Sequence, residues 1–246
     1  MNKVVISSLI FIVVAIFAAP SVHASHSNII GRWGLNENTN SIAKDTSGHN
    51  LSGIISGSGL ISGKFGNALN FNQNSYVQVP NNSLLEPQTI TIETWVRRSG
   101  SPGTFNYIAS KGASGCNTAS YALYTGASGG LQFYISNGNT FELSPDAGTG
   151  VWDGNWHHAT GTYDGANVRL YVDGLEVGTG TPTNINISYN LPDSNDLYIG
   201  RYVGTCTLTF NGDIDEVRIW NQALNQETIQ QHTNTNSSAV LPSGTP

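Results

Sequence analysis

Residues 155–178 read NWHHATGTYDGANVRLYVDGLEVG, and this stretch decides the expected fold. It contains three runs with strand-like alternation, which are divided by the pairs Asp164-Gly165 and Asp173-Gly174. Asp-Gly tolerates the positive φ that tight hairpin turns require, so the short connections predict antiparallel neighbours. The stretch is therefore expected to form an antiparallel meander.

The middle run, residues 167–173, shows how such a strand divides its side chains. Val168, Leu170 and Val172 share one face because side chains along a strand alternate, and Arg169 falls on the other face. One face is expected to be core, and the other is expected to be wet or to line a groove. Similar runs predict strands at residues 29–35, 68–71, 76–79, 89–97, 107–110, 121–124, 131–135, 141–143, 196–202, 207–210 and 212–220. The pair of runs at 68–71 and 76–79 is expected to form a hairpin, and residues 223–232 have helical spacing.

The two ends of the chain differ in composition from the part between them. A basic start at Lys3, an apolar run over residues 4–19 and a small-residue site ending at Ala24 are typical of a secretory signal peptide. A membrane anchor is the alternative, but the apolar run is shorter than the ~20 residues that a span needs. We therefore expect a signal peptide over residues 1–24, one domain over residues 28–232, a linker-like tail over residues 233–246, and a secreted or cell-surface location.

Length and charge limit the class of protein. Removal of the signal peptide would leave about 220 of the 246 residues, which suits a single all-β sandwich. Charged residues make up 11% of the chain, the net charge is −6, and no run of Lys or Arg occurs. A nucleic-acid partner is not expected, because phosphates would be repelled. No later stretch is long and apolar enough to cross a membrane.

The chain has two cysteines, Cys116 and Cys206. An exported protein occupies a compartment in which disulfides persist, so a bridge between them is expected. Two free thiols are the alternative. The bridge would close a loop of about 90 residues, which stabilises the fold by roughly 4 to 5 kcal/mol in the chain-entropy model.

Four segments carry a resemblance to a known family. WHHATGTYDG followed by VRLYVDG, together with DTSGHNLSG at 45–53, SGKFGNALNFNQNSYVQVP at 62–80 and FNGDIDEVRIWNQALNQETI at 210–229, resembles the LamG-like jelly-roll domains. These form the laminin-G and pentraxin-like branch of the concanavalin A-like lectin/glucanase fold. The resemblance implies an all-β, two-sheet antiparallel sandwich, a jelly roll, with a short C-terminal helix. It also implies a binding role.

Carboxylates near the C-terminal end of the domain offer two interpretations. Asp213 and Asp215 alternate onto one face, roughly 7 Å apart, which is compatible with a general acid and base. Alternatively, hard oxygen ligands could hold Ca²⁺. In domains of the family that the sequence resembles, an Asp matching Asp215 and oxygens matching the turn from Asp45 to Asn50 commonly hold one structural calcium, so these three residues are the expected ligands. The turn alone would also be explained by side chains that bond their own backbone.

Catalysis is the competing function. The E-x-D-x-x-E pattern of the enzymes of this fold is missing, and Glu93 stands alone in TIETWV, where Arg97 or Arg98 could pair with it. His157 and His158 point to opposite faces by alternation. For a glycan-cleaving hydrolase or lyase, Glu93, His157 and the Asp213/Asp215 pair are the residues to test.

Sugar recognition is the favoured function. Trp152, Tyr107 and Tyr189 are the expected ligand-binding residues, because aromatic side chains near loops could stack on sugar faces. The expected partner is a glycan or a glycosylated surface. A purely structural or adhesive module remains the third possibility.

Overall fold

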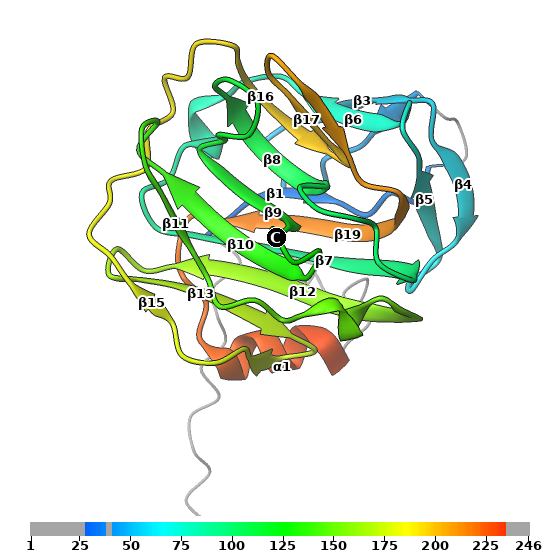
Figure 1. The fold of residues 1–246 in the computed structure, drawn as a ribbon. Helices are drawn as coiled ribbons and strands as arrows, with labels where there is room; N and C mark the ends of the chain where they lie inside the picture. Colours follow the sequence, from blue (N-terminus) through cyan, green and yellow to red (C-terminus); the bar gives the residue numbers. More distant parts are fainter. Residues whose placement is uncertain (1–27, 38–40, 235–246) are drawn as a thin grey trace, which may run out of the picture.

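The computed structural model of the protein describes residues 28–37 and 41–234, and it shows two large antiparallel sheets packed face to face (Figure 1). The first sheet has nine strands in the order β14-β13-β12-β7-β19-β5-β4, with β1 also paired to β19 and β15 to β13. Its strands are β1 (Ile29–Trp33), β4 (Gly59–Ser62), β5 (Asn67–Phe71), β7 (Ile90–Ser99), β12 (Asp153–Tyr163), β13 (Asn167–Val172), β14 (Leu175–Glu176), β15 (Thr181–Pro182) and β19 (Gly212–Trp220).

The second sheet has eight strands in the order β11-β10-β9-β8-β16-β6-β3-β2. They are β2 (Ile42–Ala43), β3 (Gly53–Ser56), β6 (Tyr76–Val79), β8 (Tyr107–Ala113), β9 (Tyr121–Thr125), β10 (Leu131–Ser136), β11 (Phe141–Leu143) and β16 (Ser194–Ile199). A separate two-stranded hairpin pairs β17 (Arg201–Val203) with β18 (Thr207–Thr209). The two short 3₁₀ turns are η2 (Ser83–Leu85) and η3 (Thr149–Val151). The all-β sandwich predicted from the sequence is confirmed.

The predicted meander is present in the nine-stranded sheet. β12 pairs with β13 from Ala159↔Val172 to Tyr163↔Val168, and β13 continues into β14. At the second turn Asp173 has a φ of 51° and Gly174 a φ of 79°, the pair of positive values that a two-residue hairpin turn needs. At the first turn only Gly165 has a positive φ, and the Asp164 carboxylate accepts hydrogen bonds from two following backbone N–H groups instead.

One expected hairpin is wrong. The sequence predicts that residues 68–71 and 76–79 pair with each other, but β5 belongs to the nine-stranded sheet and β6 to the eight-stranded sheet. The linking residues 72–75, of which 73–75 are the QNS that was expected to form the hairpin turn, cross from one sheet to the other. Both strands bury apolar side chains in the same core, which explains why their alternation looks like that of a hairpin.

The core lies between the two sheets and follows the predicted alternation. Val168 and Leu170 of β13 are completely buried in it, and they share it with Phe133 and Ile135 of the opposite sheet. The expected first strand contributes Trp33, whose indole N–H donates to the Leu51 carbonyl oxygen at 2.8 Å. Trp152 also packs in this core.

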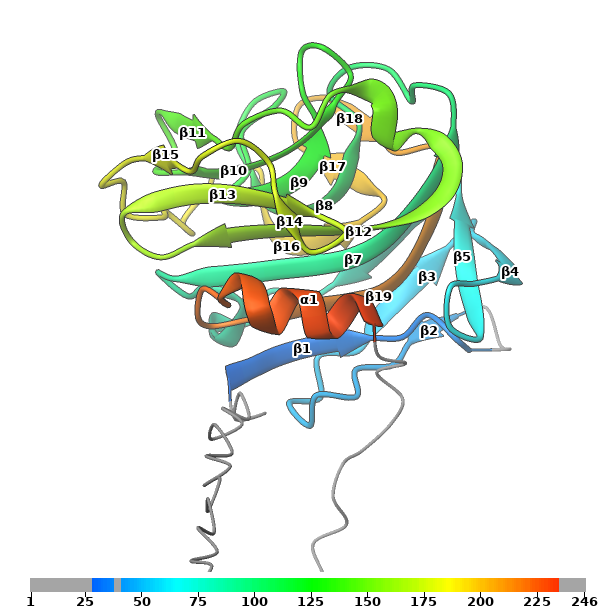
Figure 2. The ribbon, with the colours of Figure 1, turned by 90° about the horizontal axis from the view of Figure 1, so that it is seen from below.

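The outer face of the nine-stranded sheet is covered in part by the helix α1 (Gln226–Asn234), as Figure 2 shows. Ile229 of α1 packs with Tyr171, Trp220 and Ile29 in a small separate cluster. The face of β13 that was expected to be wet or to line a groove is therefore partly closed by the C-terminal helix. Among residues 28–37 and 41–234, no helix has both the length and the apolar character that a membrane span requires.

Cys116 and Cys206 form the predicted disulfide, with their Cα atoms 4.7 Å apart. The bridge joins the loop between β8 and β9 to the turn between β17 and β18. The predicted signal peptide, residues 1–24, and the tail after residue 234 lie outside the described residues.

Candidate functional site

The outer face of the eight-stranded sheet carries a second apolar cluster, separate from the core. Alternation along β10 sends Leu131, Phe133 and Ile135 into the core and leaves Gln132 and Tyr134 on the outer face. Neighbouring strands add more aromatic side chains to that face. The cluster contains Tyr107, Tyr124, Tyr134 and Tyr202, together with Ala113, Ala119 and Ala122.

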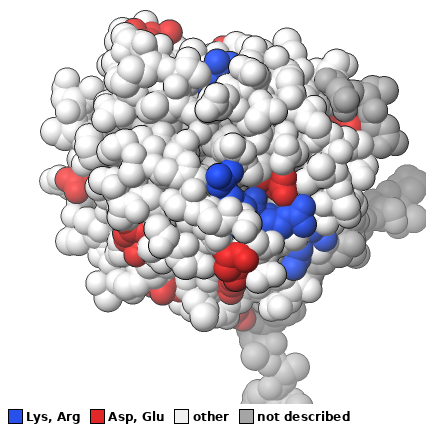
Figure 3. Space-filling view, turned by 45° about the vertical axis from the view of Figure 1, so that its right-hand side comes forward, with Lys and Arg blue, Asp and Glu red and all other residues white. Residues whose placement is uncertain are grey.

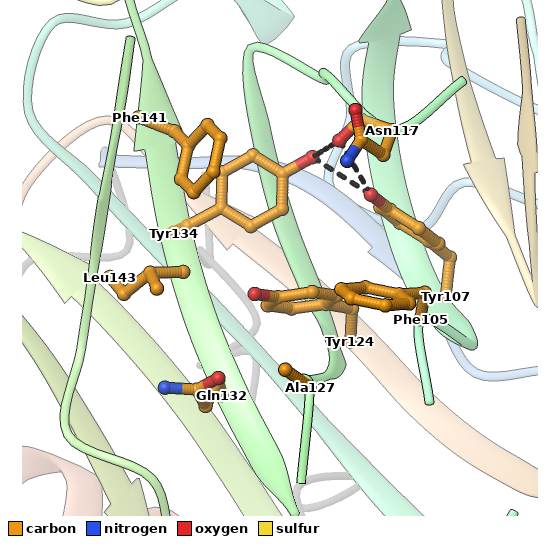
Figure 4. Close-up of a pocket in the computed structure, with 9 residues that line it drawn as sticks. All are labelled: Phe105, Tyr107, Asn117, Tyr124, Ala127, Gln132, Tyr134, Phe141 and Leu143. Carbon is orange, nitrogen blue, oxygen red and sulfur yellow. Dashed lines mark hydrogen bonds between the residues drawn. The ribbon is translucent and has the colours of Figure 1, made fainter. Parts of the chain in front are cut away.

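A pocket of about 280 Å³ opens over this cluster, above β8 to β11 (Figure 4). Three tyrosines, Tyr107, Tyr124 and Tyr134, form its floor and are almost fully buried. Two phenylalanines lie at its rim: Phe105 is 38% exposed and Phe141 is 46% exposed. The remaining lining residues are Asn117, Ala127, Gln132 and Leu143.

The floor is fixed by hydrogen bonds that use up two of its hydroxyls. The hydroxyls of Tyr107 and Tyr134 donate to the Asn117 carbonyl oxygen at 2.8 and 3.1 Å, and they lie 3.2 Å from each other. The Tyr134 oxygen also accepts from the Ala119 N–H at 2.9 Å. These rings therefore present carbon surface rather than free hydroxyls to the pocket (Figure 4).

Aromatic contacts hold the rings of the floor against one another. Tyr124 and Tyr134 meet edge to face with their centroids 5.0 Å apart, and Phe141 lies 5.8 Å from Tyr134. Tyr107 also packs at 4.9 Å against Tyr202 of the β17–β18 hairpin. The floor is preorganised because each ring is braced by another ring.

Phe105 enters the pocket from a strained backbone. Its φ is 56°, in the left-handed region that costs a residue with a Cβ about 1 kcal/mol or more. The loop is held there because the Phe105 N–H donates to the Thr125 carbonyl oxygen at 2.8 Å and the Thr125 N–H donates to the Asn106 carbonyl oxygen at 2.9 Å. Strain of this kind persists where the surroundings enforce it and often accompanies binding sites.

The wall that carries Asn117 is fixed by the disulfide. Cys116 is its neighbour in sequence, and the bridge ties it to Cys206. The Tyr202 hydroxyl bonds to the Ser114 and Gly115 carbonyl oxygens, both at 3.0 Å. The disulfide and Tyr202 therefore hold the loop that supplies the acceptor for the floor tyrosines.

Three polar groups in the lining have no partner among the described residues. They are the side-chain amide of Asn117, the Oε1 atom of Gln132 and the hydroxyl of Tyr124. The Gln132 amide nitrogen is held by the Ser144 carbonyl oxygen at 3.1 Å, which fixes the direction of its oxygen. The pocket thus combines a broad aromatic surface with a few free hydrogen-bonding groups, the usual make-up of a small-molecule site.

The residues that line the pocket bear no formal charge. Burial raises the pKa of Tyr124 to about 12 and holds the pKa of Tyr134 well above its ordinary value. The tyrosines therefore stay neutral at physiological pH. Several Lys and Arg side chains gather instead on the side of the molecule seen in Figure 3. Away from the pocket lining, Lys64 lies over the Trp95 ring and Arg97 pairs with Asp213 at 2.8 Å.

The three aromatic residues predicted to bind ligand do not come together. Tyr107 lies in the pocket floor. Trp152 is only 3% exposed, and its indole N–H donates to the Gly129 carbonyl oxygen at 2.8 Å, so its ring faces the core and is not available for stacking. Tyr189 packs edge to face against Tyr121, a core residue, outside the pocket lining.

The predicted calcium ligands do not offer one set of free oxygens. The Asp45 carboxylate already accepts from the N–H groups of Arg32, Ser47 and Leu51 at 3.0, 2.8 and 2.8 Å. Asn50 is an exposed turn residue with a φ of 60°.

Asp215 fits a cation site only in part. Its Oδ2 accepts from the Phe65 N–H at 3.0 Å, while its buried Oδ1 has no hydrogen-bond partner. Within the described ranges, no group of three or more His, Cys, Asp or Glu side chains could hold a metal ion.

The alternative catalytic residues also lie apart from the pocket. Glu93 is completely buried beneath α1, where Arg218 and the Nδ1 atom of His232 each lie 3.0 Å from its carboxylate. His157 contacts Asp153 and Asp173 at 3.1 and 2.7 Å. Glu93 is therefore enclosed in a structural ion-pair network.

A comparison with protein families accounts for this architecture. The model of the concanavalin A-like lectin/glucanases superfamily, of laminin-G type, matches residues 71–230. The chain belongs to the concanavalin A-like lectin/glucanase superfamily. The predicted resemblance is confirmed. No curated protein shows significant sequence similarity to this chain.

Several solved structures with a fold similar to that of this chain are binding domains. Domain 4 of AbnA, an extracellular arabinanase from Geobacillus stearothermophilus solved with arabinotriose, is 19% identical, with a TM-score of 0.64 over 83% of this chain and 97% of that one. The binding domain of Paraclostridial Mosquitocidal Protein 1 is 16% identical, with a TM-score of 0.64 over 85% of this chain and 52% of that one. Trypanosoma rangeli sialidase is 19% identical, with a TM-score of 0.61 over 84% of this chain and 32% of that one. At these identities the likeness shows the fold.

Sequence reasoning missed most of the pocket. It places Phe105, Tyr124, Tyr134 and Phe141 only within expected strands or loops. The available signal was the alternation in LQFYIS, which puts Tyr134 on the face opposite Phe133, but only the order of the strands shows which outer residues become neighbours.

Proposed function

We propose that the protein is an exported carbohydrate-binding module and that the aromatic pocket above β8 to β11 is its binding site. The observation that carries the proposal is the pocket itself: five aromatic rings and three unpartnered polar groups enclose about 280 Å³. Sugars bind such sites by placing their C–H faces on aromatic rings while a few hydroxyls take hydrogen bonds.

The solved neighbours support this proposal as relatives in fold. One was solved in complex with arabinotriose, and another belongs to botulinum neurotoxin type C, which depends on interaction with two ganglioside molecules to enter cells. Export is supported by the signal-like residues 1–24 of the sequence.

A glycan array read with the full-length mature protein tests the proposal. Phe141→Ala removes an exposed ring from the rim, and we expect at least a fivefold loss of affinity for any glycan that binds. Ile54→Ala is the matched control, because Ile54 is 60% exposed on β3 of the same sheet and lies outside the pocket. Equal affinity of the two variants would contradict this site, and absence of binding and of reducing-end release across a broad panel would favour an adhesive module.

Calcium binding through Asp215 stays a separate prediction. The unpartnered Oδ1 atom supports it, whereas the hydrogen bonds of Asp45 speak against Asp45 as a partner ligand. Calorimetric unfolding of wild type and Asp215→Ala, each in calcium and in chelator, decides it. We expect calcium to raise the Tm of wild type only. Equal stabilisation of both proteins would rule out Asp215 as a ligand.

A further inference from the structure

The lining of the pocket restricts the chemistry of its ligand. None of its nine residues is charged. A carboxylate or sulfate that entered would lose hydration without gaining a cationic partner, which is strongly unfavourable in an apolar site. A negative charge also acts on the floor: burial is the larger cause of the raised pKa of Tyr124, and the Asp146 carboxylate adds to it.

The floor also restricts where a ligand can place its polar groups. The hydroxyls of Tyr107 and Tyr134 are already bonded to the Asn117 carbonyl oxygen. A sugar hydroxyl pressed onto these rings would therefore lose its bonds to water and gain none. The free polar groups lie beside these two rings: Asn117 is at one end of the pocket, Gln132 is at the other, and the third is the hydroxyl of Tyr124 (Figure 4).

From this division, and on the basis of the proposed function, we infer that the pocket selects uncharged sugars that bear a methyl group. The methyl packs on the carbon surface of Tyr107 and Tyr134, whose hydroxyls are occupied, and the hydroxyls and ring oxygen of the sugar reach the Asn117 amide, the Gln132 Oε1 atom and the Tyr124 hydroxyl. Two sugar classes carry such a group: the 6-deoxyhexoses, through C6, and the N-acetylhexosamines, through the acetamido methyl.

Matched pairs of monosaccharides, titrated calorimetrically into the full-length mature protein, test the inference. L-fucose and L-galactose differ only in the C6 hydroxyl, and N-acetylglucosamine and glucose differ only in the acetamido group. We expect the methyl-bearing member of at least one pair to bind about three- to fivefold more tightly or better, the gain that follows from burying one methyl. The pair that shows the gain identifies the class.

Glucuronic acid and glucose test the effect of a charge on affinity, because glucuronic acid carries a carboxylate at C6 where glucose carries a hydroxymethyl group. We expect glucuronic acid to bind more weakly than glucose. We also expect the affinity of the preferred sugar to stay constant from about 50 to 500 mM salt, because no charge is screened.

A blocking variant ties these results to the pocket. Ala127 lines the pocket from the exposed turn between β9 and β10, so Ala127→Trp should fill it and abolish binding. Leu175→Trp is the control, since Leu175 is 63% exposed on β14 of the other sheet.

The outcomes separate the inference from the proposed function. Equal affinities within both methyl pairs, or tighter binding of glucuronic acid than of glucose, would overturn the inference and leave sugar binding intact. Full binding by Ala127→Trp would place the sugar elsewhere and overturn both. Absence of binding by every glycan, on the array as well as in solution, would also overturn both.

Discussion

At the scale of single residues, the pocket depends on side chains whose positions are imposed by their neighbours. Tyr107 and Tyr134 are held by one carbonyl oxygen of Asn117, and Phe105 is held in a backbone conformation that its side chain disfavours. The backbone of this loop is held by hydrogen bonds to Thr125 in both directions, which do not involve the Phe105 ring.

Two variants of Phe105 separate the ring from the backbone. Phe105→Ala and Phe105→Gly both remove the rim ring, so both should weaken ligand binding to the same extent. Glycine relieves the positive φ, so the Gly variant should have a free energy of unfolding about 1 kcal/mol greater than that of the Ala variant. Urea unfolding measures this difference. Phe141 in β11 is the control, because its φ is not positive and alanine should be the more stable replacement there.

At the scale of elements, α1 closes a network of buried charges on the nine-stranded sheet. Burial alone would raise the pKa of Glu93, but His232 and Arg218 hold it well below its ordinary range. Helix α1 supplies His232, whose Nδ1 atom lies 3.0 Å from the Glu93 carboxylate, so the helix is bound to the sheet by this polar contact as well as by Ile229. Undocking the helix would leave a buried carboxylate with fewer partners, which is costly.

Two adjacent histidines of β12 should respond to acid in opposite ways. Burial lowers the pKa of His158 to about 4, so the unfolded chain binds the proton more readily, and stability is lost as the pH falls from about 6.5 to 4. Burial lowers the pKa of His157, but the carboxylates of Asp173 and Asp153 outweigh it, so the pKa is raised. The stabilisation that His157 gives the fold is therefore complete at acid pH and is lost as the pH rises above about 6.5.

Replacing each histidine by glutamine tests these signs. His158→Gln should flatten the fall in the free energy of unfolding between pH 6.5 and pH 4, by an amount of the order of 3 kcal/mol at most. His157→Gln should leave that fall unchanged and should remove the loss of stability that the wild type shows as the pH rises above about 6.5. Urea unfolding at a series of pH values measures both, and parallel profiles for the two variants would contradict the assignment.

At the scale of the whole molecule, the two outer faces of the sandwich have different roles. The nine-stranded sheet carries buried charges and a helix, while the eight-stranded sheet carries an uncharged aromatic pocket. The disulfide belongs to the second face, where it joins two loops that are 90 residues apart in sequence.

Removing the bridge should affect both stability and binding. A Cys116→Ser/Cys206→Ser double variant is expected to unfold with a free energy lower by up to about 4 to 5 kcal/mol, the loop-closure value. Its affinity for the ligand should also fall, because Asn117 loses its anchor. Reduced wild type is the matched comparison. Unchanged affinity in a folded double variant would show that the Asn117 wall does not need the bridge.

The sequence predicted where the strands lie better than which strands pair with one another. Alternation located the meander and the core face of β13, and the secreted context predicted the disulfide. It could not show that β5 and β6 belong to different sheets, because both faces of a shared core produce the same pattern. The sequence predicted that Trp152 binds ligand because a buried and an exposed tryptophan look alike in a loop sequence. The pocket could not be predicted either, because its residues come from several strands whose order the sequence does not show.

The chain enters and leaves the described fold on one side. Asn28, the first described residue, precedes β1, and its carbonyl oxygen accepts a hydrogen bond from the N–H of Asn221, which follows β19 of the same sheet. Helix α1, the last described element, packs on that sheet. The pocket opens on the opposite layer. A fusion partner or immobilising surface joined at Asn28 or at Asn234 would therefore meet the nine-stranded side of the fold and leave the mouth of the aromatic pocket accessible.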